Sequence, residues 1–133
     1  MQVHTASKKF IWLLLFVILT YWAFGMYYHL VFRYWWFDIL THTMGGAWAM
    51  FFAHRYLNDW FLSPSFLKNI ILILGVVTLC GVLWEFGGFV LDRYIVKTGF
   101  TLLSGTYEDT LADLLWDMVG ALSGYLLLYK YYD

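Results

Sequence analysis

Residues 107–124 read YEDTLADLLWDMVGALSG, and this stretch combines two properties that rarely occur together. From Asp109 onward the sequence is mainly apolar over a length that suits a membrane-spanning helix. It also carries Asp113 and Asp117, so that three aspartates follow one another at four-residue spacing. At about 100° per residue their side chains lie within about 80° of one another on a helix. An ionised carboxylate in a membrane is costly unless it is paired or lines a water-filled cavity, so the stretch predicts a spanning helix with an inward-facing acidic stripe.

The composition excludes an ordinary water-soluble domain. Of the 133 residues, 62% are hydrophobic, 23% are aromatic and only 13% are charged. A chain this short cannot bury so much apolar surface in a core of its own, so the lipid bilayer must solvate it. The single cysteine, Cys80, excludes a disulfide framework and a thiolate metal site. The net charge of -1 gives no basic surface for nucleic acid, and no nucleic-acid partner is expected.

Four apolar segments meet the requirement of about 20 residues for a membrane span. They predict an all-α polytopic membrane protein, a four-helix antiparallel transmembrane bundle in which residues 1–133 form a single domain. The predicted spans are residues 10–32, 38–57, 68–92 and 109–131. The first is longer than the apolar core of a cleaved signal peptide, so it is expected to be retained as a helix.

The lysines and arginines predict the orientation of this bundle. Cytoplasmic connections carry an excess of these residues. One side of the predicted bundle holds five of them and the other holds three: Lys8, Lys9, Arg55, Lys68 and Lys130 against Arg33, Arg93 and Lys97. This bias predicts that both termini are cytoplasmic.

Each predicted span carries a polar stripe near its outer end. The second span has Asp38 and His42 one helical turn apart, and the third has Glu85 on a stripe of small residues. The first span repeats the arrangement more weakly with His29 and Arg33. Small residues let helices approach closely in lipid, so six glycines are expected at helix–helix contacts: Gly45, Gly46, Gly81, Gly88, Gly120 and Gly124.

Acids outnumber bases on these stripes, so protons, a bound metal ion or a cationic substrate must balance the charge. Carboxylate oxygens with one or two imidazoles suit Mg²⁺, Mn²⁺, Zn²⁺ or non-haem iron. The sequence therefore predicts a divalent metal site, without fixing the metal, formed by His42, Glu85, Asp113, Asp117 and Asp38. Asp38, one turn before His42, is expected to orient the imidazole ring. For Asp38 and Asp109, capping of a helix N-terminus is an alternative role.

The motifs WFD-x3-H-x2-GG, WEF-x-G and YEDTLADLLWDMVGALSG resemble those of the VanZ-like family of small bacterial integral membrane proteins. The resemblance covers roughly residues 38–124 and is greater still to uncharacterised inner-membrane relatives with a DT-x2-D-x3-D motif. It implies a helical fold of about four spans in a bacterial inner membrane. It also implies that Asp38, His42, Glu85, Asp109, Asp113 and Asp117 are the polar positions shared by the family. The sequence departs from the pattern at Gly88, where glutamine is typical, and at Asp117, where asparagine is typical.

Three functions fit this pattern. The first is a metal-dependent hydrolase or transferase acting at the outer leaflet on a phosphate- or glycan-bearing membrane lipid. In that enzyme Asp109 or His29 would move protons, and Arg33 or Arg93 would bind the headgroup. The connection containing Ser104 and Thr106 would cover the site. The second is a cation or proton transporter using the same acids. The third is an accessory membrane subunit, and the sequence leaves a homo-oligomer or a larger membrane complex open.

Overall fold

The computed structural model describes residues 6–57, 65–97 and 107–130, and within these ranges the chain is helical and contains no strand. The elements are α1 (Lys8–Tyr27), α2 (Leu30–Arg33), α3 (Trp35–Tyr56), α5 (Phe66–Val90), the π-helical segment η1 (Leu91–Val96) and α6 (Tyr107–Lys130). The all-α prediction is therefore confirmed. The connection expected to cover the site, with Ser104 and Thr106, lies outside the described residues.

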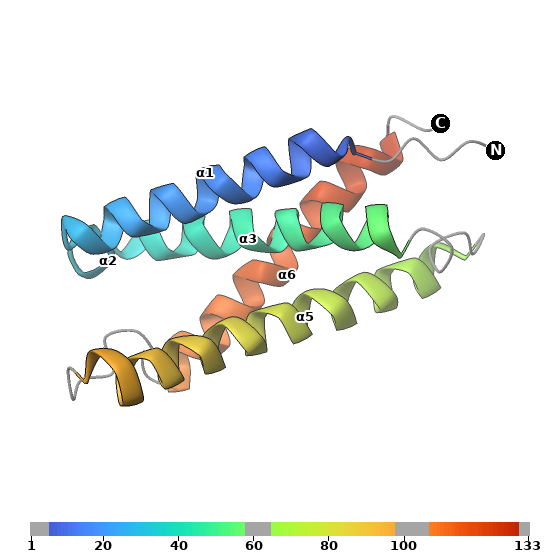
Figure 1. The fold of residues 1–133 in the computed structure, drawn as a ribbon. Helices are drawn as coiled ribbons and strands as arrows, with labels where there is room; N and C mark the ends of the chain where they lie inside the picture. Colours follow the sequence, from blue (N-terminus) through green and yellow to red (C-terminus); the bar gives the residue numbers. More distant parts are fainter. Residues whose placement is uncertain (1–5, 58–64, 98–106, 131–133) are drawn as a thin grey trace.

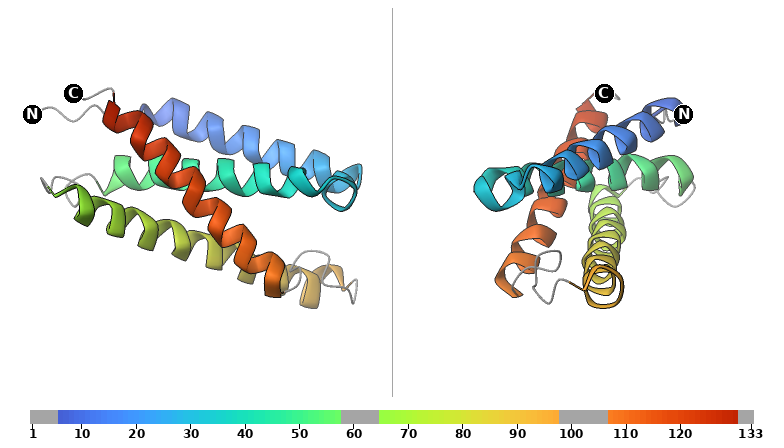
Figure 2. Two further views of the ribbon diagram at one scale, coloured as in Figure 1. Left: turned by 180° about the vertical axis from the view of Figure 1, so that it is seen from behind. Right: turned by 60° about the vertical axis from the view of Figure 1, so that its left-hand side comes forward.

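The four long helices run alternately in opposite directions (Figure 1). Helix α3 lies between α1 and α5, and α6 crosses behind α3 and α5 at a steep angle (Figures 1 and 2). The most extensive contact joins α3 to α6, followed by α5 to α6. The beginning of α1 and the end of α6 lie at the same end of the molecule (Figure 1). The connection between α1 and α3, η1 and the beginning of α6 lie at the opposite end.

The first predicted helix is shorter than expected. Helix α1 ends at Tyr27, because His29 adopts a left-handed conformation with φ 56° that closes the helix. The backbone N–H of Tyr28 donates to the carbonyl oxygen of Phe24 at 3.0 Å. The chain then forms the short α2 before α3 begins at Trp35. His29 and Arg33 therefore belong to the connection between two long helices and not to a continuous span over residues 10–32.

The other predicted helices match observed elements with small changes in their ends. Helix α3 extends the predicted 38–57 at its beginning, and α6 covers Tyr107–Lys130 against the predicted 109–131. Helix α5 starts after Ser65, whose hydroxyl accepts a hydrogen bond from the N–H of Lys68 at 3.5 Å. Its predicted end falls inside η1, where the backbone changes to π-helical hydrogen bonding.

Within the described parts of the chain, three helices are long and apolar enough to cross a membrane: Lys8–Tyr27, Phe66–Ile95 and Tyr107–Leu128. Helix α3 has 22 residues and is long enough, but it is not among them. Its tryptophan, threonine, glycine and histidine residues lower its hydropathy. The structure therefore supports a helical membrane protein with three candidate spans, and the predicted four-span bundle is not confirmed by length and composition.

The distribution of polar and apolar side chains is reversed relative to a soluble domain. Large apolar side chains face outward along α1, where Leu13 is 62% exposed and Phe16 is 67% exposed. In contrast, several polar side chains are buried: Thr41, His42, His54, Asp92, Asp113 and Asp117. Lipid chains solvate apolar side chains as well as a protein core does, so this arrangement suits a membrane environment.

Glycines allow α3 and α6 to approach closely. A side chain on Gly46 would collide with the backbone carbonyl of Asp117, and one on Gly120 would collide with the carbonyl of Thr43. Gly124 faces the methyl group of Met50 in the same interface. Helix–helix contact is thus confirmed for these three glycines and for Gly81, which faces Leu114 and Asp117. Two others of the predicted set, Gly45 and Gly88, line pockets.

Candidate functional site

Four carboxylates from three helices surround the imidazole of His42. Its Nε2 atom lies 3.7 Å from Oδ1 of Asp113, 3.9 Å from Oδ1 of Asp38 and 3.9 Å from Oε1 of Glu85. On the other side of the ring, Nδ1 lies 3.3 Å from Oδ1 of Asp117. Helix α3 supplies Asp38 and His42, α5 supplies Glu85, and α6 supplies Asp113 and Asp117. We call these five residues the acidic cluster.

Helix geometry explains how the cluster is assembled. Asp38 and His42 are one turn apart on α3, and Asp113 and Asp117 are one turn apart on α6, so each pair projects from one face of its helix. The close α3–α6 contact at Gly46 and Gly120 brings the two faces together. Because α6 crosses α3 at an angle, its two aspartates reach different nitrogen atoms of the same ring.

Two hydrogen bonds hold three members of the cluster in place: His42, Asp117 and Glu85. Nδ1 of His42 and Oδ1 of Asp117 are within hydrogen-bonding distance at 3.3 Å. When Asp117 is ionised it accepts from Nδ1–H, and a neutral ring then has the lone pair on Nε2. The hydroxyl of Thr110 donates to Oε2 of Glu85 at 3.3 Å. Thr110 was not among the predicted site residues, although it is part of the DT-x2-D-x3-D motif.

The cluster carries more negative charge than its own imidazole can balance. If all four carboxylates were ionised and the imidazole protonated, the cluster would carry a net charge of -3. Asp113, Asp117 and His42 are buried, so water screens this charge poorly. Protons or a cation must therefore neutralise part of it. The donors of Asp38, His42 and Asp113 all lie within 4.8 Å of one another and could hold a metal ion.

A polar pocket with a volume of about 920 Å³ opens over the cluster. Its walls include the carboxylates of Asp38, Glu85, Asp109 and Asp113 together with His42. Gly88 and Leu91, at the junction of α5 with η1, also line this pocket. Four of the five ionisable side chains named here are acids, so the pocket favours a cationic or metal-bridged occupant.

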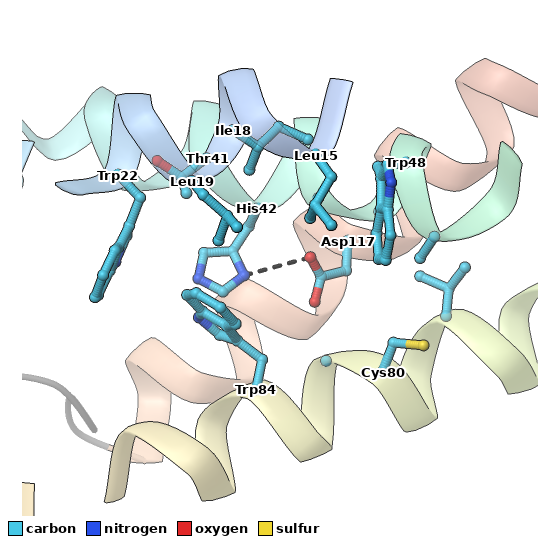
Figure 3. A pocket seen from close by; sticks show the side chains of 15 residues that line it. Leu15, Ile18, Leu19, Trp22, Thr41, His42, Trp48, Cys80, Trp84 and Asp117 are labelled. Atoms are coloured by element: carbon cyan, nitrogen blue, oxygen red, sulfur yellow. Dashed lines mark hydrogen bonds and ion pairs between the residues drawn. The ribbon is translucent and has the colours of Figure 1, made fainter. Parts of the chain in front are cut away.

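A second, apolar pocket of about 110 Å³ lies on the other side of His42, between α1 and α5 (Figure 3). Leu15 and Ile18 of α1 face it from one side and Cys80 of α5 from the other, and Asp117 is its acidic residue. Its walls share four residues with the polar pocket: Leu19, Trp22, His42 and Trp84. The two pockets therefore meet at the imidazole.

Two tryptophans mark the boundary between the pockets. Trp22 of α1 and Trp84 of α5 make an edge-to-face contact with ring centroids 5.5 Å apart. Figure 3 shows both beside the His42 ring. The sequence indicated only that the aromatic residues face lipid or form belts at the membrane surface. Trp84 directly precedes Glu85 in the sequence. This adjacency was the one feature of the sequence that could have indicated an aromatic ring beside the site.

The remaining predicted site residues lie at the margin. Asp109 is exposed and lines the mouth of the polar pocket. The described residues that line this pocket include neither His29 nor Arg33. The His29 ring lies near Phe32, and the Arg33 guanidinium lies 5.8 Å from the centroid of the Tyr34 ring. The structure thus brings together Asp38, His42, Glu85, Asp113 and Asp117 and leaves His29 and Arg33 outside the cluster.

The apolar helices and buried acids define a helical membrane protein. The chain belongs to the family described as predicted membrane protein (DUF2238), whose match extends over residues 1–133. This match does not name the VanZ-like proteins, so that resemblance stays a prediction from the motifs. No curated protein and no solved structure matches the chain.

Proposed function

We propose that the protein is a metal-dependent membrane enzyme acting on a phosphate- or glycan-bearing lipid. One observation carries the proposal: carboxylate oxygens of Asp38, Glu85 and Asp113 lie 3.7–3.9 Å from the same Nε2 atom of His42. A divalent ion held there would polarise a phosphoryl oxygen and lower the pKa of a bound water. The donor types suit Mg²⁺, Mn²⁺, Zn²⁺ or Fe²⁺.

The spacing of the donors fits such an ion. Two donors bound to one ion at about 2.1 Å lie about 3.0–3.4 Å apart as neighbours and about 4.2 Å apart on opposite sides. The three distances to Nε2 lie between these two values, and the donors of Asp38, His42 and Asp113 lie within 4.8 Å of one another, so side-chain shifts would be needed to bring them onto one ion. The polar pocket leaves room beside the donors for a lipid headgroup.

Asp117 has a different position from the other acids, which supports a different role. It contacts Nδ1 and so occupies the place of the carboxylate that orients a metal-binding histidine. In our proposal Asp117 therefore takes the orienting role that the sequence analysis gave to Asp38, and Asp38 joins the metal ligands. Asp117 could still approach an ion through its second oxygen after a side-chain rotation.

The remaining residues serve binding and proton transfer. In hydrolysis, a water oxygen would bond to phosphorus, the phosphorus–oxygen bond to the lipid would break, and the departing oxygen would take up a proton. Asp109, at the mouth of the polar pocket, is placed to transfer that proton. Val31 and Phe32 of the adjoining connection line the polar pocket. We therefore propose that Arg33, next to them in the chain, contacts the headgroup and that His29 is the alternative proton carrier.

The membrane arrangement in this proposal has α3 as a fourth span. Its buried polar residues face the other helices, so their low hydropathy does not prevent insertion. The five-to-three distribution of lysine and arginine favours cytoplasmic termini and an outward-facing site. The VanZ-like motifs favour a bacterial inner membrane.

The core below the cluster argues against the transporter alternative. Met50, Ile73 and Val77 are fully buried there, in an apolar group that α3 and α5 share with Ala121 of α6. A conducted ion would need polar contacts along such a path. We therefore favour the enzyme over the transporter as the proposed function.

An assay with purified protein in lipid nanodiscs tests the proposal. Phosphate-bearing and glycan-bearing lipids would be supplied in turn with Mg²⁺, Mn²⁺ or Zn²⁺, and headgroup release would be measured. We expect turnover that a chelator removes and that Asp113→Asn abolishes, while Glu108→Gln retains it because Glu108 is an exposed acid on the same helix. Absence of turnover across phosphate- and glycan-bearing lipids, with metal bound and the fold intact, would overturn the enzymatic part.

A further inference from the structure

We propose that the apolar pocket between α1 and α5 holds a hydrocarbon chain of the same phosphate-bearing lipid whose headgroup lies in the polar pocket. This inference rests on the proposed function and adds a binding subsite to it. The pocket is open at the surface where α1 and α5 face each other, since Leu19 is 42% exposed and Trp84 is 43% exposed. On a membrane-embedded chain this opening faces lipid.

The two pockets follow the order of a lipid molecule along the helices. On α3, Asp38 lines the polar pocket, His42 lines both, and Ala49 lines the apolar pocket. At about 1.5 Å per residue, Ala49 lies about 16 Å further along the helix than Asp38. A headgroup near the membrane surface and a chain directed toward the bilayer centre would occupy the pockets in that order.

Helices α1 and α5 show the same order. On α5, Val77 and Cys80 line the apolar pocket and Glu85 lines the polar pocket. On α1, Leu15 lines the apolar pocket and Met26 lines the polar one. Three helices from different parts of the chain therefore place their apolar and polar linings at matching depths, as an amphiphilic occupant requires.

The size of the pocket limits its occupant. An engineered apolar cavity of about 150 Å³ in another protein binds benzene, and this pocket measures about 110 Å³. A segment of a single chain fits that space, whereas a helix about 10–12 Å across does not. The Trp22–Trp84 pair, which lines both pockets, would contact the chain near its junction with the headgroup.

Photocrosslinking tests the proposal. An alkyl phosphate with a diazirine partway along its chain would be added to the protein in nanodiscs, and labelled residues would be mapped by mass spectrometry. We expect preferential labelling near Leu15, Leu19 and Cys80, above the level found on lipid-facing residues such as Leu13 and Phe16. Uniform labelling of the exposed apolar faces would overturn the proposal. The proposal would also be overturned if a diazirine-bearing alcohol of the same chain length labelled the pocket as strongly as the alkyl phosphate does.

A pair of glycine variants provides the matched control. Gly45 lines the apolar pocket, and a Cβ there would meet only Oδ1 of Asp117 at 3.7 Å, so Gly45→Leu would fill the pocket. A Cβ at Gly75 would meet nothing within 4 Å, so Gly75→Leu adds the same side chain in open space. We expect Gly45→Leu to lose the preferential labelling and Gly75→Leu to keep it. Unchanged labelling in folded Gly45→Leu would contradict the proposal.

The alkylation rate of the natural cysteine tests the chain subsite without any substitution. Cys80 is the only cysteine in the chain and lines the apolar pocket. We expect the alkyl phosphate to slow its alkylation by N-ethylmaleimide, and an unchanged rate at saturating probe would count against the subsite.

The metal content of the same samples separates the two proposals, the metal centre and the chain subsite. Protection and labelling without metal would refute the metal centre alone, whereas bound metal without either would refute the chain subsite alone.

Discussion

At the scale of single residues, the two nitrogens of His42 divide the acidic cluster. Nδ1 is hydrogen-bonded to Asp117, and Nε2 faces Asp38, Glu85 and Asp113. This division gives the ring a defined orientation between the two groups of acids. It also separates residues proposed to bind a metal from the residue proposed to orient the ligand.

The distinction predicts different effects for two neighbouring aspartates. Asp117→Asn should weaken metal binding by about 10–100-fold, because it removes the carboxylate that orients the ring, while the ligands remain. Asp113→Asn should cause the larger loss, because it replaces an ionised carboxylate ligand with a neutral amide. Titration with Mn²⁺, followed by electron paramagnetic resonance, measures both affinities. Equal affinities in wild type and Asp117→Asn would refute the orienting role.

The sequence predicted which residues would meet but not how they would divide around the ring. Four-residue spacing placed Asp113 and Asp117 on one helical face, and the structure brings both to His42. Which of them reaches Nδ1 depends on the angle at which α6 crosses α3, and periodicity within one helix carries no information about that angle. For the same reason Trp22 and Trp84 could not be distinguished from lipid-facing tryptophans.

At the scale of elements, the α3–α6 contact positions the site. Two of the five residues that make up the cluster, His42 and Asp117, lie within four residues of a contact glycine, Gly46 or Gly120. These glycines were identified from their place on the polar stripes. The break after α1 was not, because an uninterrupted apolar run from Phe10 to Phe32 contains no proline to indicate where the helix ends.

Enlarging a contact glycine should destabilise the protein. Gly120→Leu would force its side chain against the carbonyl of Thr43, and overpacking of this kind typically costs about 1–3 kcal/mol or more. Thermal unfolding in detergent should therefore show a lower midpoint for Gly120→Leu. Gly75→Leu, which adds the same side chain in open space, should leave the midpoint close to that of wild type. Equal midpoints for the two variants would contradict the close packing of α3 on α6.

At the scale of the whole molecule, the number of spans decides where the termini lie. If α1, α3, α5 and α6 all cross the membrane, both termini are on the same side; if α3 does not cross, they are on opposite sides. We expect reporter fusions at both ends to give cytoplasmic signals, since lysine and arginine favour that side. Signals from opposite sides would refute the four-span arrangement, and two external signals would reverse the proposed orientation.

The central claim is that the acidic cluster binds a divalent metal ion, and elemental analysis of the purified protein tests it most directly. Protein offered Mg²⁺, Mn²⁺, Zn²⁺ and Fe²⁺ and then freed of unbound ions should retain about one or two ions per chain. Glu108→Gln should retain the same amount, and Asp113→Asn should lose most of it, because only the second change removes a donor facing Nε2 of His42. Metal content in folded wild-type protein no higher than in folded Asp113→Asn would contradict the claim. In that case protons alone would balance the four carboxylates.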